Sequence, residues 1–230
     1  YAASAITAVT VQNTLGVESV HAIPLDTVRG QIDAVLSDIG ADAVKIGMVS
    51  NASLMETIAD RLMFWNAQNI VVDPVMVSTS GADLMQSAAV KTLKERLLPL
   101  ASLATPNIPE AEVLSGLTIR DKTDMIAAAT AISQNCGCAV LLKGGHSIND
   151  ANDLLIAEDE ATWLYGKRIH NPNTHGTGCT LSSAIASNLA YGMELSDAVR
   201  RAKEDISGAL SAMLDLGKGS GPMNHAFKIN

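Results

Sequence analysis

The sequence predicts one α/β domain, in which a mostly parallel, doubly wound sheet is flanked by helices in three α/β/α layers. Two observations predict it. Short apolar runs alternate along the chain with longer segments of helical periodicity, and this alternation implies right-handed crossovers between parallel strands. The chain has 230 residues and shows no internal repeat and no linker rich in Pro, Gly or Ser, a length and texture that suit one α/β domain.

The strands are predicted from short apolar runs that are rich in Val, Ile, Leu and Ala. Five such runs are expected to form strands: Ala5–Val11, Ala43–Ile46, Ile70–Asp73, Leu103–Thr105 and Ala139–Leu142. The first of them is expected to be buried. A β-hairpin is expected further on, with strands Leu154–Ala157 and Thr162–Tyr165 joined by an acidic turn.

Helices are predicted where apolar residues recur every three or four positions. One such face consists of Val28, Ile32, Val35, Leu36 and Ile39. A second helix begins after Asn51, a suitable N-cap, with Leu54, Ile58, Leu62 and Trp65 on one face. Two more helices follow Thr177, and the second has an apolar face of Val199, Ala202, Ile206, Leu210 and Met213.

Composition excludes several classes of protein. The net charge is −8 and no basic run occurs, whereas a nucleic-acid-binding protein needs a positive face. No apolar run approaches the roughly 18 residues of a membrane span. The three cysteines, Cys136, Cys138 and Cys179, fit neither a disulfide framework nor a zinc motif. We therefore expect reduced thiols, a cytoplasmic location and no partnership with nucleic acid or membrane.

Polar residues follow the predicted strands in four places. Asp73 ends one strand, and Lys143 ends another. A third cluster has Thr105, Asn107 and Glu110, and a fourth is a glycine-flanked turn that opens a helix, 174–186. In an open α/β sheet, ligands bind beyond the carboxyl ends of the strands. These four clusters therefore predict an active site at that edge.

The turn NTHGTGCT has the features of an anion site. Gly176 and Gly178 permit backbone torsions that other residues resist. The first N–H groups of the following helix have no intrahelical acceptor and favour a bound anion. Such donors stabilise the charge that phosphoryl transfer spreads over oxygen. The alternative is an ordinary glycine turn that caps a helix. No GxxxxGK[ST] loop occurs.

Cys179 lies in the first turn of that helix. The helix dipole there favours the thiolate, which is able to act as general base toward a substrate hydroxyl. The alternative is a small buried residue that packs the helix against the sheet.

Asp73 and Glu110 are candidate ligands of Mg²⁺, which prefers carboxylates, waters and substrate phosphates. Asn107 forms with Glu110 an NxxE unit suited to orienting a metal-bound water. The alternative for Glu110 is a charge that complements the helix dipole. Lys143 is a candidate phosphate ligand, or else a solvated lysine at a strand end.

The motifs QNT, KIGM, VVDPVM, TPNIPEAE, LLKGGH and NTHGTGCTLSSAIA occur in this order. Together they resemble the hydroxymethylpyrimidine/phosphomethylpyrimidine kinases of thiamine biosynthesis, in the ribokinase-like superfamily. The resemblance extends from Ser4 to the terminal GSGPMNH. Cys in HGTGC, where most ribokinase relatives have Asp, points to this branch.

The resemblance implies a role for each matching residue. It implies that Gln12 hydrogen-bonds the aminopyrimidine ring and that Met48 packs against it. ATP phosphate would be held by Lys143, with Asn107 and Thr174 in the nucleotide site, and Mg²⁺ would be served by Asp73 and Glu110. The anion hole would be 174–178, with Gly176, Thr177 and Gly178 beside the reacting group, and Cys179 would lie nearest the acceptor hydroxyl.

The resemblance also implies the reaction, which is ATP-dependent phosphorylation of 4-amino-5-hydroxymethyl-2-methylpyrimidine and then of its monophosphate. Two alternatives stay open: a pyridoxal kinase of the same Cys-bearing type, and a nucleotide-binding protein without turnover. We expect one kinase domain over residues 1–230 and a homodimer. The family's N-terminal strand and glycine-rich segment, of the type AGTDPSGGAGIQAD, do not occur here, so we expect the native protein to carry them before Tyr1.

Overall fold

The structure is a computed structural model that describes residues 1–49, 51–76, 87–145 and 151–229. Its main sheet has six strands in the order β3 (Val44–Ile46), β4 (Ile70–Val72), β5 (Leu103–Ala104), β6 (Ala139–Leu142), β7 (Asp153–Ala157) and β8 (Glu160–Leu164). The first four strands are parallel, and β7 and β8 are antiparallel. The predicted mostly parallel sheet and its terminal hairpin are confirmed, with ends that differ by one or two residues.

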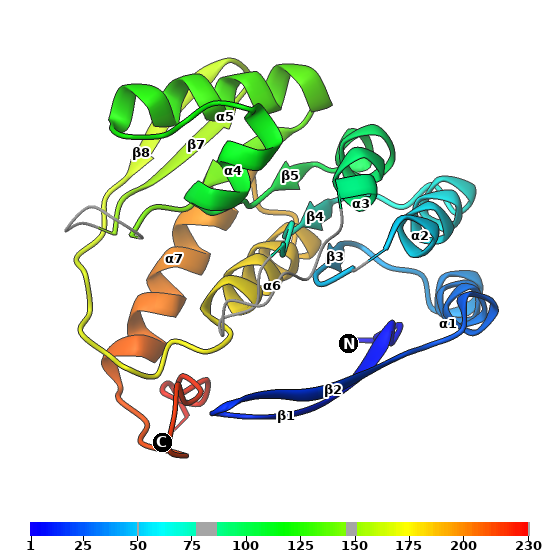
Figure 1. The fold of residues 1–230 in the computed structure, drawn as a ribbon, viewed down its shortest axis with the longest axis horizontal. Coiled ribbons are helices and arrows are strands. Elements are labelled where there is room, and N and C mark those ends of the chain that lie inside the picture. The colour runs from blue at the N-terminus through cyan, green and yellow to red at the C-terminus, as the bar shows by residue number, and fades with distance from the viewer. Residues whose placement is uncertain (50, 77–86, 146–150, 230) are drawn as a thin grey trace.

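Helices cover both faces of this sheet, as the three-layer prediction requires (Figure 1). Side chains alternate along a strand, so Val72 packs into the core under one helical layer and Val71 into the core under the other. The first layer contains α1 (Leu25–Asp38), α2 (Ala52–Phe64), α3 (Ser87–Thr92), α4 (Ile108–Ser115) and α5 (Lys122–Cys136). The second contains α6 (Thr177–Ala190) and α7 (Leu195–Ser211).

The strand order follows the chain order from β3 to β6, so the crossover helices all lie on one face. The opposite face is covered by α6 and α7, which come after the sheet is complete. A π-helical turn, η1 (Leu93–Leu97), and a 3₁₀ turn, η2 (Leu98–Leu100), lead into β5. None of the helices in the described ranges is long and apolar enough to span a membrane.

Local signals set the helix ends. The Asn51 side chain accepts a hydrogen bond from the N–H of Leu54 at 2.9 Å, which confirms the predicted N-cap. Two residues of the predicted apolar faces were placed wrongly. Ile39 follows the end of α1 and is 58% exposed, and Met213 lies beyond α7 and is 53% exposed. In each case the helix ends before the periodic pattern does.

The predicted buried strand Ala5–Val11 is wrong in its surroundings. Its larger part lies in β1 (Ala8–Asn13), which pairs with β2 (Gly16–Ala22) in a separate two-stranded sheet. Both strands are largely exposed; Val9 and Val11, for example, are each 53% exposed. An apolar run of this length does not reveal whether other strands flank it, so periodicity alone did not separate a central strand from a projecting hairpin.

Candidate active site

The polar clusters meet in a cleft of ≈ 1180 Å³ at the carboxyl edge of the parallel strands. Strand β4 brings Asp73 there, and β6 brings Lys143. The start of α4 and the start of α6 supply the remaining groups. Nine of the predicted site residues line the cleft: Asp73, Asn107, Glu110, Lys143, Thr174, Gly176, Thr177, Gly178 and Cys179.

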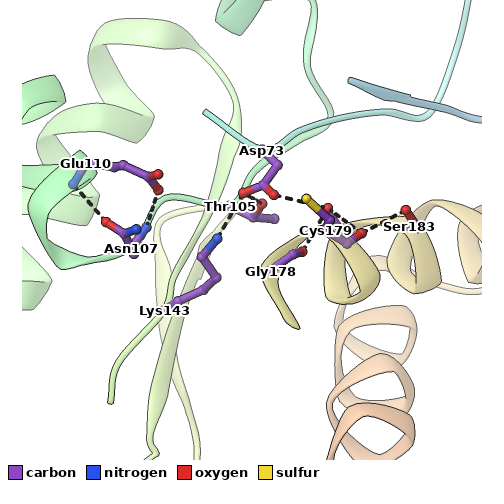
Figure 2. Close-up of polar contacts among 9 residues, drawn as sticks. Asp73, Thr105, Asn107, Glu110, Lys143, Gly178, Cys179 and Ser183 are labelled. Atoms are coloured by element: carbon purple, nitrogen blue, oxygen red, sulfur yellow. Dashed lines mark hydrogen bonds and ion pairs between the residues drawn. The ribbon is translucent and has the colours of Figure 1, made fainter. Parts of the chain in front are cut away.

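An ion pair lies in the lining of this cleft. The Nζ of Lys143 donates to Oδ1 of Asp73 at 2.9 Å, and the two side chains are 15% and 2% exposed. Thr105 donates its hydroxyl to the same oxygen at 3.2 Å, and Ser182 in α6 donates to Oδ2 at 3.5 Å. Figure 2 shows this carboxylate between Lys143 and the first turn of α6. The Asp73 carboxylate is therefore held by three donors, and it fixes the position of the Lys143 ammonium.

Asn107 and Glu110 form a capping box at the start of α4. The N–H of Asn107 donates to Oε2 of Glu110 at 2.8 Å, and the N–H of Glu110 donates to Oδ1 of Asn107 at 2.9 Å. The carboxylate of Glu110 is thus a helix-terminal group, as the alternative interpretation held, and it also lines the cleft. Glu110 both caps the helix and lines the cleft because α4 begins at the edge of the sheet.

Burial raises the pKa of Glu110 above its ordinary value of 4.5. The Lys143 ammonium and the hydrogen bond from Asn107 oppose this rise, and the nearby charge of Asp73 adds to it. Two carboxylates close enough to influence each other create a negative site that favours a cation.

The first turn of α6 presents an anion site. Gly176 is its N-cap, with φ of 81°, and no side chain caps the helix. A left-handed N-cap of this kind favours glycine. A Cβ added at Gly178 would lie 3.2 Å from Nζ of Lys143 and 3.7 Å from Oδ2 of Asp73. Glycine at this position therefore lets the helix N-terminus approach the ion pair closely.

Cys179 is the exposed cysteine at the third position of α6, and it lines the cleft. The packing alternative for this residue does not hold, because the thiol is not buried. Cys136 and Cys138 are buried, and burial raises the pKa of Cys138 to about 12. These two thiols therefore stay neutral and belong to the core.

The two residues predicted to bind the acceptor lie outside the cleft lining. Gln12 in β1 places Nε2 at 3.4 Å from Nε2 of His175, so the hairpin reaches the glycine turn. Met48 follows β3 and is half-buried. The hairpin tip also contacts the C-terminal segment, where the N–H of Lys218 donates to the hydroxyl of Thr14 at 3.2 Å.

Three residues in or beside the site were given no role of their own from the sequence. His175 stands inside the glycine turn, where its contact with β1 depends on tertiary structure. Ser182 lies four residues after Gly178, and helical spacing was a usable signal for it. Lys203 in α7 lines the cleft, and no motif in the sequence marks it, because its place depends on how α7 packs.

Comparison with known proteins places this geometry in a family. The family model described as phosphomethylpyrimidine kinase matches residues 1–224. A hydroxymethylpyrimidine/phosphomethylpyrimidine kinase from Haemophilus influenzae is 45% identical over 230 residues, covering 98% of this chain and 86% of that protein. This chain belongs to the phosphomethylpyrimidine kinase family.

Solved structures agree with this assignment. A phosphomethylpyrimidine kinase from Clostridium difficile 630 superposes with a TM-score of 0.81 at 42% identity, over 90% of this chain and 85% of that one. A pyridoxal kinase from Bacillus subtilis, solved as an ADP complex, superposes with a TM-score of 0.90 at 33% identity, over 98% and 87%. Backbone shape is therefore shared by both kinds of kinase, while sequence identity is greater to the phosphomethylpyrimidine kinase.

Proposed function

We propose that this chain transfers the γ-phosphoryl group of ATP to the hydroxymethyl group of 4-amino-5-hydroxymethyl-2-methylpyrimidine, and then a second phosphoryl group to the resulting monophosphate, in thiamine biosynthesis. One observation carries the proposal beyond family membership. Lys143, Asp73 and the uncapped N-terminus of α6 meet in one cleft. A lysine and free N–H donors of this kind are what a transferring phosphoryl group needs.

Each group has a task in this reaction. Lys143 binds an ATP phosphate, with Asn107 and Thr174 lining the same nucleotide cleft. The N–H groups at the start of α6 stabilise negative charge on the equatorial oxygens. In its thiolate form, Cys179 faces the acceptor hydroxyl and accepts its proton as the new O–P bond forms and the bond to the ADP leaving group breaks. Gln12, which contacts His175 of the glycine turn, and Met48 bind the pyrimidine ring.

The carboxylates fit a magnesium ion. Within the described ranges, no three His, Cys, Asp or Glu side chains gather as a metal site. Asp73 and Glu110 would supply protein oxygens, and waters and nucleotide phosphates would complete the shell, as Mg²⁺ commonly requires. When bound, Mg²⁺ would neutralise charge on the phosphates. Asp73 and Glu110 would hold the ion, and Asp73 also keeps Lys143 in place.

Glu110→Gln separates the two roles of this side chain. Glutamine keeps the size and the oxygen that accepts from Asn107, so the capping box and the fold should persist. Removing the charge should move the Mg²⁺ concentration for half-maximal activity upward by about tenfold, the effect of roughly 1.4 kcal/mol. A Mg²⁺ titration of both proteins measures this, and superposable curves would assign Glu110 to the helix end alone.

The pH dependence has a defined sign. The pKa of Glu110 is raised in the folded state, so the folded protein binds this proton more tightly than the unfolded chain does. The stability that results is complete below the ordinary pKa of 4.5 and is lost as pH rises through the pKa of the folded state. Mg²⁺ requires the ionised form. The apparent affinity for Mg²⁺ should therefore fall as pH drops toward the raised pKa, and the Glu110→Gln variant should lack this component.

An acceptor assay tests the proposed function. ADP release by the full chain is measured with the hydroxymethylpyrimidine, its monophosphate and pyridoxal in turn. Turnover of both pyrimidines with a kcat/KM at least tenfold above that of pyridoxal supports the proposal. A preference for pyridoxal would favour the alternative to which the Bacillus subtilis structure points. ADP binding without turnover of any acceptor would indicate a silent nucleotide-binding protein.

We place the protein in the cytoplasm as a homodimer without nucleic-acid or membrane partners. The dimer is supported by the β1–β2 hairpin, which exposes Val9, Val11, Val17 and Val20. An isolated two-stranded hairpin is marginally stable in water, so covering it with a second copy would stabilise it. The mass in solution, measured by light scattering, tests this assembly.

A further inference from the structure

A buried ion pair outside the proposed catalytic set lies in the wall of the cleft. Lys203 in α7 and Asp153 at the start of β7 form it, with side chains 16% and 12% exposed. The Nζ of Lys203 also donates to the carbonyl of Ala151 at 2.7 Å. Transferring two charges from water is costly enough that a buried pair is weak evidence for stability by itself. The role of this pair is therefore sought in its other hydrogen bonds.

The second oxygen of Asp153 reaches the residue after the phosphate-binding lysine. Oδ1 of Asp153 accepts from the N–H of Gly144 at 2.8 Å. The preceding residue, Lys143, donates its own N–H to the carbonyl of Pro106 at 2.8 Å. Adjacent N–H groups of the chain are thus fixed from both sides, and the backbone that carries the Lys143 side chain is held between β5 and β7.

Close packing leaves no room for a side chain on this backbone. A Cβ added at Gly144 would lie 2.0 Å from the carbonyl oxygen of Asn152. On the other side of the pair, a Cβ added at Gly166 would lie 3.0 Å from Cε of Lys203 and 2.8 Å from the carbonyl of Ala151. Lys203 therefore connects α7 to both segments that border the cleft, through its stem and its charge.

We propose that Lys203 and Asp153 are positioning residues for the nucleotide, which hold the Gly144 backbone and thereby fix Lys143 at the cleft wall. This inference rests on the proposed function in one respect, the binding of ATP phosphate by Lys143. The pair itself needs no contact with the acceptor. It should therefore affect nucleotide affinity and leave acceptor affinity unchanged.

Three variants of the full chain test the inference. Lys203→Met keeps the stem and removes the charge, Asp153→Ala removes the acceptor for Gly144, and Asp153→Asn keeps an oxygen there while losing the charge. Calorimetric binding of ADP and the KM for ATP are measured. For Lys203→Met and Asp153→Ala, the Kd for ADP and the KM for ATP should each rise by about tenfold, the effect of one lost charge-assisted hydrogen bond. Asp153→Asn should show a smaller rise, and the acceptor KM should stay within about twofold.

Arg200→Met is the matched control, because Arg200 lies on the same helix and pairs with Asp197 at 2.5 Å in solvent. The Kd for ADP and the KM for ATP of this variant should equal those of the parent. Unchanged ADP affinity in a folded Asp153→Ala or Lys203→Met variant would overturn the inference. If neither folds, Asp153→Asn decides, since an ADP affinity equal to the parent's would show that the pair serves stability alone.

The design also separates this inference from the proposed function. ADP binding requires no acceptor, so weaker binding by the variants supports the positioning role even when the parent phosphorylates no pyrimidine. Conversely, turnover of the pyrimidine with ADP affinities equal to the parent's would retain the function and reject the positioning role.

Discussion

Replacing Cys179 with alanine should lower kcat by about 10²–10⁴-fold, the usual contribution of a general base. The thiol is exposed at the first turn of α6 and lines the cleft beside the anion site. The N–H donors of that turn belong to the backbone and survive the substitution. ADP affinity and the KM for ATP should therefore remain those of the parent, and kcat measured at saturating acceptor checks the effect.

Ser183→Ala is the control for this experiment. Ser183 lies one turn further along α6, is exposed, and donates its hydroxyl to the carbonyl of Cys179 at 2.8 Å. Its loss should leave kcat nearly unchanged. The rival view is that the transition state is loose enough to need little help from a base. A Cys179→Ala kcat within about threefold of the parent would support that view and remove Cys179 from the base role.

Lys143→Met should produce two losses of different origin. The first is catalytic, because the phosphate loses its cation, and kcat/KM for ATP should fall by at least about tenfold. The second is structural. Asp73 is 2% exposed, and a buried carboxylate without its cation destabilises the fold by about 3 kcal/mol. Chemical denaturation and steady-state kinetics measure the two losses independently.

Adding Asp73→Asn to Lys143→Met distinguishes them. The double variant has no unpaired buried charge. The single amide oxygen at position 73 still accepts from Thr105, and Ser182 keeps the carbonyls of Gly178 and Cys179 as acceptors. Stability should recover most of its loss while activity should not. A double variant as unstable as the single one would mean that the ion pair is not the source of the destabilisation, and restored activity would remove Lys143 from phosphate binding.

The fold was largely predictable because its signals are local. Parallel strands buried on both faces appear as continuous apolar runs, and Ile70–Val72 and Ala139–Leu142 were found from that property. Asn51 predicts the start of α2 because its side-chain oxygen is able to accept a hydrogen bond from the first turn of the helix. The site edge was predictable for a related reason: the polar residue that follows a parallel strand lies at the ligand-binding edge whatever the rest of the chain does.

By itself the sequence determined the strands of the main sheet, the start of α6 at a glycine turn, and which polar residues belong to one edge. Only the tertiary structure decided how these residues are engaged. The Asp73–Lys143 pair joins positions 70 residues apart, and the exposure of β1 depends on which strands flank it. The contact of Lys203 with Asp153 depends on how α7 packs across the sheet. Such contacts depend on the packing of distant elements, which no local pattern of residues encodes.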